Sequence, residues 1–195
     1  MAAAPEFGVL LYSEARRRGC QRAQQLIVLG DGAPWIWNLA EEHFPSALQV
    51  VDLYHSRQHV HQLAQVVMPA DDEVAHKWLA DRLAELDRGA VEALLEAARE
   101  VEAGAAQRHA IDRASNYFTV NRDRMRYSRF REMGIFVGSG AVEVGCRAVT
   151  AQRMKLSGMR WRVHGAAAIV SLRCQEASRR WDEIWTWLTH QTEVA

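Results

Sequence analysis

The sequence predicts an α-rich α/β fold, and three observations support this prediction. Residues 26–29 form a short continuous apolar run that ends in a glycine-flanked turn, as a strand buried on both faces usually does, and residues 48–51 supply a second strand that ends at Asp52. Residues 34–43 lie between these segments and begin with proline, which suits the first turn of a helix. After His55 the apolar residues recur at helical spacing through most of the remaining chain. Strand, helix and strand in so short a segment indicate a parallel βαβ unit.

Taken in order, the predicted elements form one domain over residues 1–195. A first helix precedes the βαβ unit and ends in a basic run followed by Gly19. Ser139 is a good N-cap for a later helix, because its hydroxyl can accept a backbone hydrogen bond. The domain is predicted to contain a βαβ part at 7–55, helices at 56–131 and further helices at 132–190. The individual helices are predicted at 7–25, 34–43, 117–132, 139–155 and 163–190, with helical spacing also through 78–101.

Composition places the chain among soluble globular proteins. It is 49% hydrophobic and 25% charged. It has no apolar run near the roughly 20 residues that a membrane-spanning helix needs, so no membrane partner is expected. No basic segment followed by an apolar stretch marks a secretory signal at the N-terminus. The three cysteines lack metal-site spacing, which favours reduced thiols in the cytoplasm.

The formal net charge of zero conceals an uneven distribution of charge. Residues 71–102 contain ten acidic and four basic side chains, whereas residues 122–180 contain thirteen basic and four acidic ones. A basic block of this kind raises the expectation of a polyanionic partner such as DNA. A solvated helix face with scattered ion pairs is the alternative reading.

Two carboxylates stand at positions where metal chemistry is plausible. Asp31 follows the first predicted strand, and functional groups of open α/β sheets lie at this end. Glu143 falls in the first turn of the helix that follows the glycine-rich turn at 138–140. Each has an ordinary alternative: a turn aspartate for Asp31 and a residue favoured by the helix dipole for Glu143. Together they could share Mg²⁺ ions during phosphoryl transfer.

Six blocks of the sequence resemble DDE transposases of the ISKra type of bacterial insertion sequences, which are distant relatives of the Mutator-like transposases. The blocks follow the family order and spread over about residues 7–187. No single block is decisive, but the ordered set is specific. The matching segments are residues 29–37, 51–55, 138–143, 152–155, 158–161 and 172–174.

The resemblance implies a role for each matching residue. Asp31 would be the second catalytic aspartate and Glu143 the catalytic glutamate, together binding Mg²⁺ or Mn²⁺. The fold would be ribonuclease-H-like, as in retroviral integrases, with residues 56–131 as a helical insertion. Asp52 and His55 would match a (Cys/Asp)-x-x-His element with a supporting role. The partners would be DNA, as element ends and target, and further copies of the chain.

Other readings of the residues after the second strand remain open. His55 could be a hydrogen-bonded structural histidine at the strand end. Asp52, His55 and His59 could bind zinc, but they lack a fourth ligand with suitable spacing.

The first catalytic aspartate of such transposases belongs on a strand that would precede residue 7. The chain is therefore expected to be a C-terminal part of the transposase that is inactive alone. It is also expected to have an unpaired sheet edge and poor solubility. The alternatives are a DNA-binding remnant that inhibits a full-length transposase, or an unrelated helical interaction protein.

Basic residues around Glu143 are predicted to contact DNA phosphates, which gives affinity without sequence specificity. Trp161, between two arginines, is a candidate for stacking on DNA, whereas Trp35, Trp37, Trp181 and Trp185 are expected in the core. The predicted phosphate contacts are Arg124, Arg126, Arg129, Arg131, Arg153, Lys155, Arg160 and Arg162.

Overall fold

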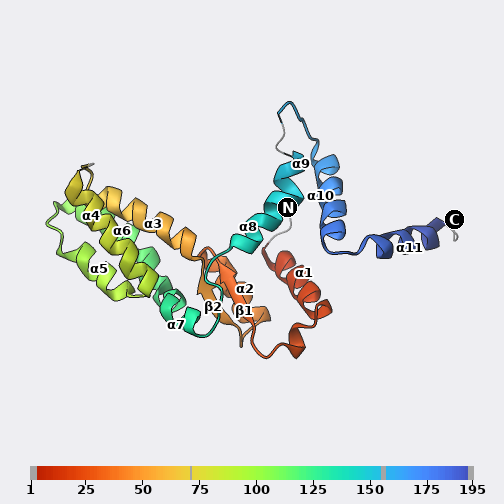
Figure 1. Cartoon of the computed structure of the whole chain (residues 1–195), viewed down its shortest axis with the longest axis horizontal. Helices are drawn as coiled ribbons and strands as arrows, with labels where there is room; N and C mark the ends of the chain where they lie inside the picture. Colours follow the sequence, from red (N-terminus) through yellow and green to blue (C-terminus); the bar gives the residue numbers. More distant parts are fainter. Residues whose placement is uncertain (1–3, 71, 155–156, 193–195) are drawn as a thin grey trace. The chain divides into compact units, whose positions relative to one another are not determined.

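The computed structural model of the chain describes residues 4–70, 72–154 and 157–192 (Figure 1). Contacts divide the chain into two compact units, Met1–Ser139 and Gly140–Ala195. The elements of the first unit are α1 (Ala4–Arg17), η1 (Cys20–Arg22), β1 (Ile27–Gly30), α2 (Pro34–His43), β2 (Leu48–Val51), α3 (Leu53–Val67), α4 (Glu73–Arg88), α5 (Val91–Glu100), α6 (Ala105–Asn121), η2 (Arg122–Met125) and α7 (Tyr127–Glu132). Those of the second unit are α8 (Gly140–Cys146), η3 (Arg147–Ala151), α9 (Gln152–Met154), α10 (Val163–Ala177) and α11 (Trp181–Thr192).

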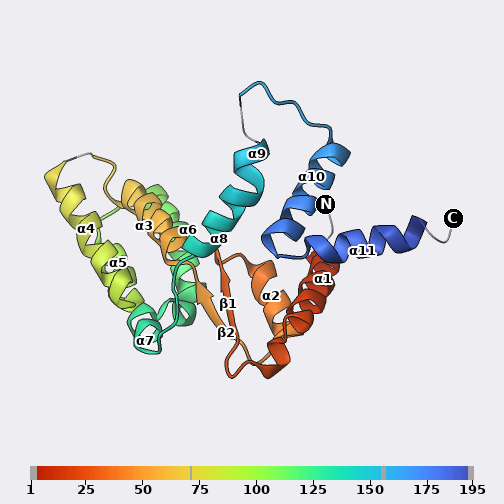
Figure 2. The same ribbon diagram turned by 45° about the vertical axis from the view of Figure 1, so that its right-hand side comes forward.

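β1 and β2 form a parallel two-stranded sheet, connected by α2 (Figure 2). Gly30 pairs with Val51, and the ladder continues one step further where the Asp52 N–H donates to the Gly30 carbonyl at 2.7 Å. Trp37 of α2 is buried against the strands, as the apolar composition of this segment requires. The predicted α-rich fold with a parallel βαβ unit is thereby confirmed.

α1 packs against α2 through a close approach at Gly8. A Cβ atom on Gly8 would lie 2.6 Å from His43 Nε2 and 2.7 Å from Leu39 Cδ2, so a larger residue would force these side chains of α2 to shift. The rings of Phe7 and Trp35 meet edge to face, with centroids 6.2 Å apart. Leu10 of α1 remains 63% exposed, so α1 presents apolar side chains to solvent as well as to α2.

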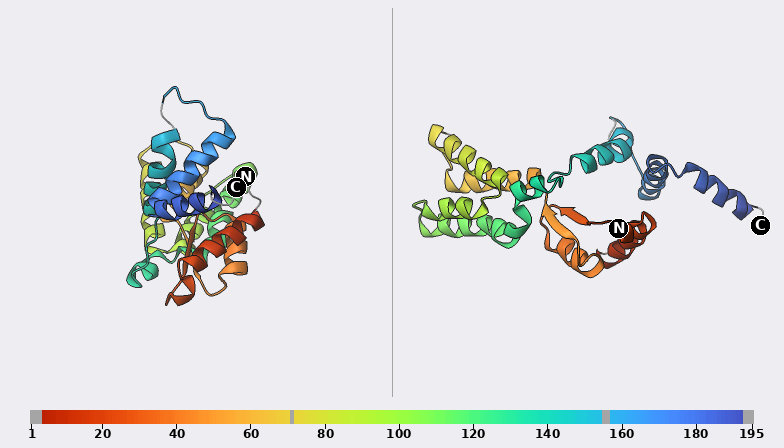
Figure 3. Two further views of the ribbon diagram at one scale, coloured as in Figure 1. Left: turned by 90° about the vertical axis from the view of Figure 1, so that its right-hand side faces the viewer. Right: turned by 60° about the horizontal axis from the view of Figure 1, so that its bottom comes forward.

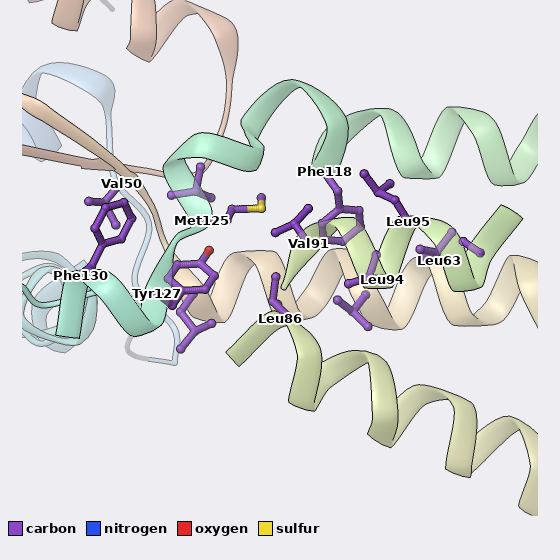
Figure 4. Packing of buried hydrophobic residues seen from close by; sticks show 14 of the residues in the cluster. Val50, Leu63, Leu86, Val91, Leu94, Leu95, Phe118, Met125, Tyr127 and Phe130 are labelled. Atoms are coloured by element: carbon purple, nitrogen blue, oxygen red, sulfur yellow. The ribbon is translucent and has the colours of Figure 1, made fainter. Parts of the chain in front are cut away.

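The core of the first unit lies among α3, α4, α5, α6 and α7, which follow one another as a helical group (Figure 3). Its largest buried side chains come from nearly every one of these helices and from β2 (Figure 4). Helical spacing of apolar residues predicts such a group, because each helix must bury one face. The labelled members are Val50, Leu63, Leu86, Val91, Leu94, Leu95, Phe118, Met125, Tyr127 and Phe130.

Local signals fix the ends of α4 within this group. Asp72 caps its N-terminus, accepting the Ala75 N–H at 2.8 Å. Gly89 ends it with a φ of 74°, the left-handed conformation that glycine adopts without a Cβ penalty. An ion pair between Arg57 Nε and Asp87 Oδ1, 3.0 Å apart, links α3 to α4 near this end.

After α7 the chain returns to the sheet. The Val137 carbonyl accepts the Leu53 N–H at 2.8 Å, and Ile135 is buried. Gly138 lies against the Tyr54 ring, where a Cβ atom would come within 2.8 Å of Tyr54 Cε2. The last residues of the first unit are thus held where β2 ends and α3 begins.

In the second unit, α10 contacts the π-helical segment η3. Arg173 of α10 donates from Nε to the Val149 carbonyl at 2.8 Å and from Nη2 to the Ala148 carbonyl at 2.5 Å. A π-helix leaves carbonyls outside the normal α-helical pattern, and the Arg173 guanidinium satisfies two carbonyls of this segment.

Several predicted helices are broken in the structure. The first ends at Arg17 rather than 25, the 117–132 segment contains η2, and the 139–155 segment contains η3. The predicted helix at 163–190 is two helices, separated where Arg179 has a φ of 56°. No glycine or proline marks this last break in the sequence, so pattern alone did not indicate it.

Trp37 is in the core as predicted, but Trp35, Trp181 and Trp185 are more than 40% exposed, so their prediction as core residues was wrong. Trp181 and Trp185 instead contact each other across α11, with ring centroids 6.0 Å apart. Within the part of the chain that the structure describes, no helix is both long and apolar enough to span a bilayer.

Candidate functional site

Asp31 lies directly after β1, at the carboxyl end of the strand, as predicted from the sequence. Its side chain is exposed, and its Oδ1 accepts the Ala33 N–H at 2.9 Å. Gly32 follows with a φ of 96°, which allows the chain to turn sharply into α2. The turn therefore presents a carboxylate to solvent at the edge where the two parallel strands end.

Aromatic and imidazole side chains surround this turn. The Tyr117 hydroxyl donates to the Asp31 carbonyl at 2.9 Å. The His59 ring stacks on Tyr117, with centroids 3.6 Å apart and planes inclined by 19°. His55 meets His59 edge to face at 5.0 Å. Two helices, α3 and α6, thus contribute side chains around the residue that ends β1.

Burial sets the protonation of this group. Burial lowers the pKa of His59, and the neighbouring His55 lowers it further, while the charge of Asp31 acts in the opposite direction. Burial also raises the pKa of Tyr117 to about 12, and the charges of Asp31 and Asp52 add to this effect. His59 is therefore neutral and Tyr117 protonated at neutral pH.

Asp52 is buried and uses both carboxylate oxygens for backbone hydrogen bonds. Oδ1 accepts the His55 N–H at 2.7 Å, the bond of an N-cap residue for α3. Oδ2 accepts the N–H of Ser139, 87 positions further along the chain. The Asp-x-x-His spacing is therefore the spacing of a helix cap, and Asp52 ties the end of the first unit to the sheet edge. Ser139, predicted as an N-cap through its hydroxyl, is held here through its backbone.

Glu143 lies in α8, within the second unit, and its side chain is outside the described part of the structure. The same holds for the side chain of Arg153, while Lys155 is outside the described residues altogether. Among the residues that are described, no three His, Cys, Asp or Glu side chains group closely enough to hold a metal ion. At the edge where the two strands end, the carboxylate of Asp31 is exposed and that of Asp52 is buried.

Three of the predicted DNA-contacting arginines have partners within the first unit. Arg124 donates from Nε to the Gln49 side chain at 2.6 Å and lies over the Trp37 ring. Arg126 pairs with Glu92 at 2.8 Å. Arg131 donates to the Asp87 carbonyl at 2.6 Å. These arginines join elements of the fold.

The other described candidates for DNA contact are more accessible. Arg129, Arg160 and Arg162 are exposed. Trp161 is partly buried, and its Nε1 has no hydrogen-bond partner among the residues that the structure describes. Of the predicted basic set, the exposed members in the described structure are therefore Arg129, Arg131 and the pair that flanks Trp161, and Arg131 is bound to the Asp87 carbonyl.

A hollow of about 400 Å³ lies elsewhere in the first unit, where α3 turns into α4. Its lining includes His61, His76, Met68 and Leu79. Asp31 and Asp52 are not among its lining residues, so it is separate from the strand-end group.

The sequence did not indicate two residues that contact the Asp31 turn. Tyr117 and Asn121 lie on α6, more than 80 positions from the turn, and reach it through tertiary packing. Their four-residue spacing places them on one face of a helix, which was the one available signal.

The fold and the site together define an α-rich α/β protein with a group of carboxylates and imidazoles at the ends of two parallel strands. The family model described as "Uncharacterised protein family (UPF0236)" matches residues 15–182, so the chain belongs to that family. Neither the curated proteins nor the solved structures yielded a match.

Proposed function

We propose that this chain is part of a DDE-type DNA transposase of the ISKra type, in which Asp31 and Glu143 are two of the metal-binding carboxylates. The observation that carries the proposal is the position of Asp31. An exposed carboxylate follows a parallel strand, at the edge of the sheet where α/β proteins bind their ligands.

The path of the chain supports the second carboxylate. Ser139 is hydrogen-bonded to Asp52, the residue after β2, and Glu143 follows four residues later. In this proposal β1 and β2 belong to a ribonuclease-H-like sheet, α3 to α7 form its helical insertion, and a further segment supplies the remaining carboxylate.

The chemistry would follow from cations shared by these carboxylates. Mg²⁺ or Mn²⁺ accepts hard oxygen ligands and retains waters that substrate phosphates replace. When bound, such ions would supply activation of an attacking oxygen, of water or of a DNA 3′-hydroxyl, and stabilisation of the leaving oxygen. Asp31 and Glu143 would bind the ions, while Asp52 would hold the chain leading to Glu143.

DNA would be held by the remaining members of the predicted basic set. Arg124, Arg126 and Arg131 join elements of the fold and are therefore left out of the proposed phosphate contacts. Trp161 remains the candidate for stacking on DNA bases. This set is Arg129, Arg153, Lys155, Arg160 and Arg162.

Paramagnetic broadening by Mn²⁺ tests the metal part of the proposal in the ¹⁵N-labelled full chain. Mn²⁺ should broaden the amide signals of Gly32 and Ala33, and Asp31→Asn should remove this effect. Glu143→Gln should weaken it. The control is Asp112→Asn, which removes an exposed carboxylate of α6 and should leave the broadening unchanged. Equal broadening in wild type and Asp31→Asn would show that Asp31 is not a ligand.

A second candidate function, protein–protein interaction, is favoured by one observation. Apolar residues of α1 and α2, among them Leu10 and Trp35, are widely exposed. A chain that neither responds to Mn²⁺ at Asp31 nor binds duplex DNA at low salt would fit this candidate better than the transposase.

A further inference from the structure

Two side chains of α6 hold the backbone of the Asp31 turn from outside the βαβ unit. The Tyr117 hydroxyl donates to the Asp31 carbonyl at 2.9 Å. Asn121 Nδ2 donates to the next carbonyl, that of Gly32, at 3.4 Å. Consecutive carbonyls of one turn are therefore bound by residues one helical turn apart, which share a face of α6.

Asn121 is held in place by further hydrogen bonds. Its side chain is 1% exposed, and its Oδ1 accepts the Trp37 Nε1–H at 2.9 Å. An indole nitrogen can only donate, so the amide oxygen must face Trp37 and the amide nitrogen must face Gly32. Nδ2 also donates to the Tyr117 carbonyl at 3.1 Å. The amide thus links α2, the turn and α6.

Tyr117 is fixed by packing as well as by hydrogen bonding. The ring of His59 stacks on it at 3.6 Å. On the turn, a Cβ atom at Gly32 would lie 2.7 Å from Tyr117 Cε2, so the backbone approaches the ring as closely as glycine permits. Little space remains for the hydroxyl or the turn to move independently.

We propose that Tyr117 and Asn121 are positioning residues for the Asp31 carboxylate. They hold the turn so that one carboxylate oxygen stays on the Ala33 N–H and the other is left for a cation. The cation part of this inference rests on the proposed role of Asp31 as a metal ligand. The two hydrogen bonds from Tyr117 and Asn121 to the turn, here called the clamp, do not depend on that role.

Amide hydrogen exchange tests the clamp independently of any metal. Tyr117→Phe removes one hydroxyl and keeps the ring that stacks on His59. Exchange at Gly32 and Ala33 should become about tenfold faster, since about one net hydrogen bond is lost. The matched control is Tyr12→Phe, which removes a hydroxyl from α1, where the ring stacks on His43. Unchanged exchange at the turn in Tyr117→Phe would overturn the inference, whatever the metal results show.

Measuring Mn²⁺ affinity then shows whether Tyr117 and Asn121 position the Asp31 carboxylate for a cation or only stabilise the turn. At a temperature where all variants are folded, Tyr117→Phe should weaken Mn²⁺ binding about three- to tenfold, as expected for the loss of one hydrogen bond that orders the site. Asn121→Ala should weaken it at least as much. Faster exchange with unchanged Mn²⁺ affinity would show a structural role only and would overturn the positioning role. Failure of the wild type to bind Mn²⁺ would overturn the metal role of Asp31, and exchange would still decide the clamp.

Discussion

Asp52 differs from the other capping aspartate of the first unit in burial and in the number of backbone groups it binds. It is 6% exposed and serves two N–H groups, whereas Asp72 is exposed and serves one. A buried N–H that loses its acceptor costs more than an exposed one, because water cannot replace the bond. The resemblance implied an Asp-x-x-His element at Asp52, and in the structure this spacing caps α3.

We expect Asp52→Ala to lower the free energy of unfolding by about 2–3 kcal/mol and Asp72→Ala by about 1 kcal/mol. Asp52→Asn should lie between wild type and Asp52→Ala, because the amide keeps one acceptor. Urea denaturation followed by circular dichroism measures all three. Equal losses at Asp52 and Asp72 would contradict the two-bond role of Asp52.

His59 makes the stability of the first unit depend on pH. Its pKa in the folded chain lies below the ordinary histidine value of about 6.5, because of burial and the neighbouring His55, so the unfolded chain binds the proton more readily. Its contribution is therefore complete above pH 6.5 and is lost as the pH falls through the folded pKa. His59→Gln should flatten the decline in thermal unfolding midpoint between pH 7 and pH 5. Replacing the exposed His109 of α6 by Gln should leave the decline as it is.

The sequence predicted the strand-end residues but not the residues that hold them. Asp31 and Asp52 could be predicted because a buried apolar run has a recognisable end, and parallel strands end at one edge. Tyr117 and Asn121 reach the turn through the packing of α6 on α3, which no local pattern encodes. Arg124 and Arg126 were predicted to bind DNA because their charge is visible in the sequence, while their partners Gln49 and Glu92 are distant in it.

At the level of elements, α6 connects the helical core to the candidate site. Phe118 points into the core with no exposed surface, while the adjacent Tyr117 and nearby Asn121 reach the Asp31 turn. Within four residues, α6 therefore contacts both the core and the Asp31 turn. Helices were expected over 56–131, but neither the core position of α6 nor its contact with the turn was predicted from the sequence.

Phe118→Ala should lower the free energy of unfolding by about 3–5 kcal/mol, because it leaves a cavity where α3, α5 and α6 meet. Val120→Ala, two residues further and 56% exposed, should change it by less than about 0.5 kcal/mol. Chemical denaturation measures both. A small loss for Phe118→Ala would mean that the core around it repacks or is not formed.

Element boundaries were predicted less well than element types. The break between α10 and α11 falls at Arg179, a non-glycine residue with positive φ, and the π-helical segment η3 interrupts an otherwise regular stretch. Arg173 donates to the Val149 carbonyl within η3, whereas local hydrogen bonds close the end of α10, from the Arg179 N–H to the Glu176 carbonyl and from the Arg180 N–H to the Gln175 carbonyl. Neither interaction is visible in the apolar spacing of the sequence.

At the scale of the whole molecule, the helical part of the first unit and the second unit differ in the sign of their charged residues. Acidic residues dominate 71–102, and several arginines of 122–131 pair with them or with nearby groups. The exposed cations at Arg160 and Arg162 belong to the second unit. DNA affinity, if the proposed function holds, should therefore depend mainly on the second unit.

Neutralising Arg153, Lys155 and Arg160 together should weaken duplex DNA binding for all sequences. It should also flatten the plot of log affinity against log salt by up to about one unit per lost phosphate contact. The matched control replaces Arg16 and Arg17 of α1 and the following Arg18 by Gln, which removes the same charge from the first unit and should change the slope little. Binding that ignores salt in the wild type would contradict a DNA-binding role.

The hydrogen bond between Asp52 and Ser139 also bears on how the first unit folds. It closes a loop of 87 residues, whereas most contacts of α3 to α7 join neighbouring helices. Closing long loops costs entropy that local contacts do not, so we expect the helices to associate before this loop closes. Substitutions at Asp52 should then accelerate unfolding and leave the refolding rate nearly unchanged. The segment that leads to Glu143 would be the last part of the unit to dock and the first to detach.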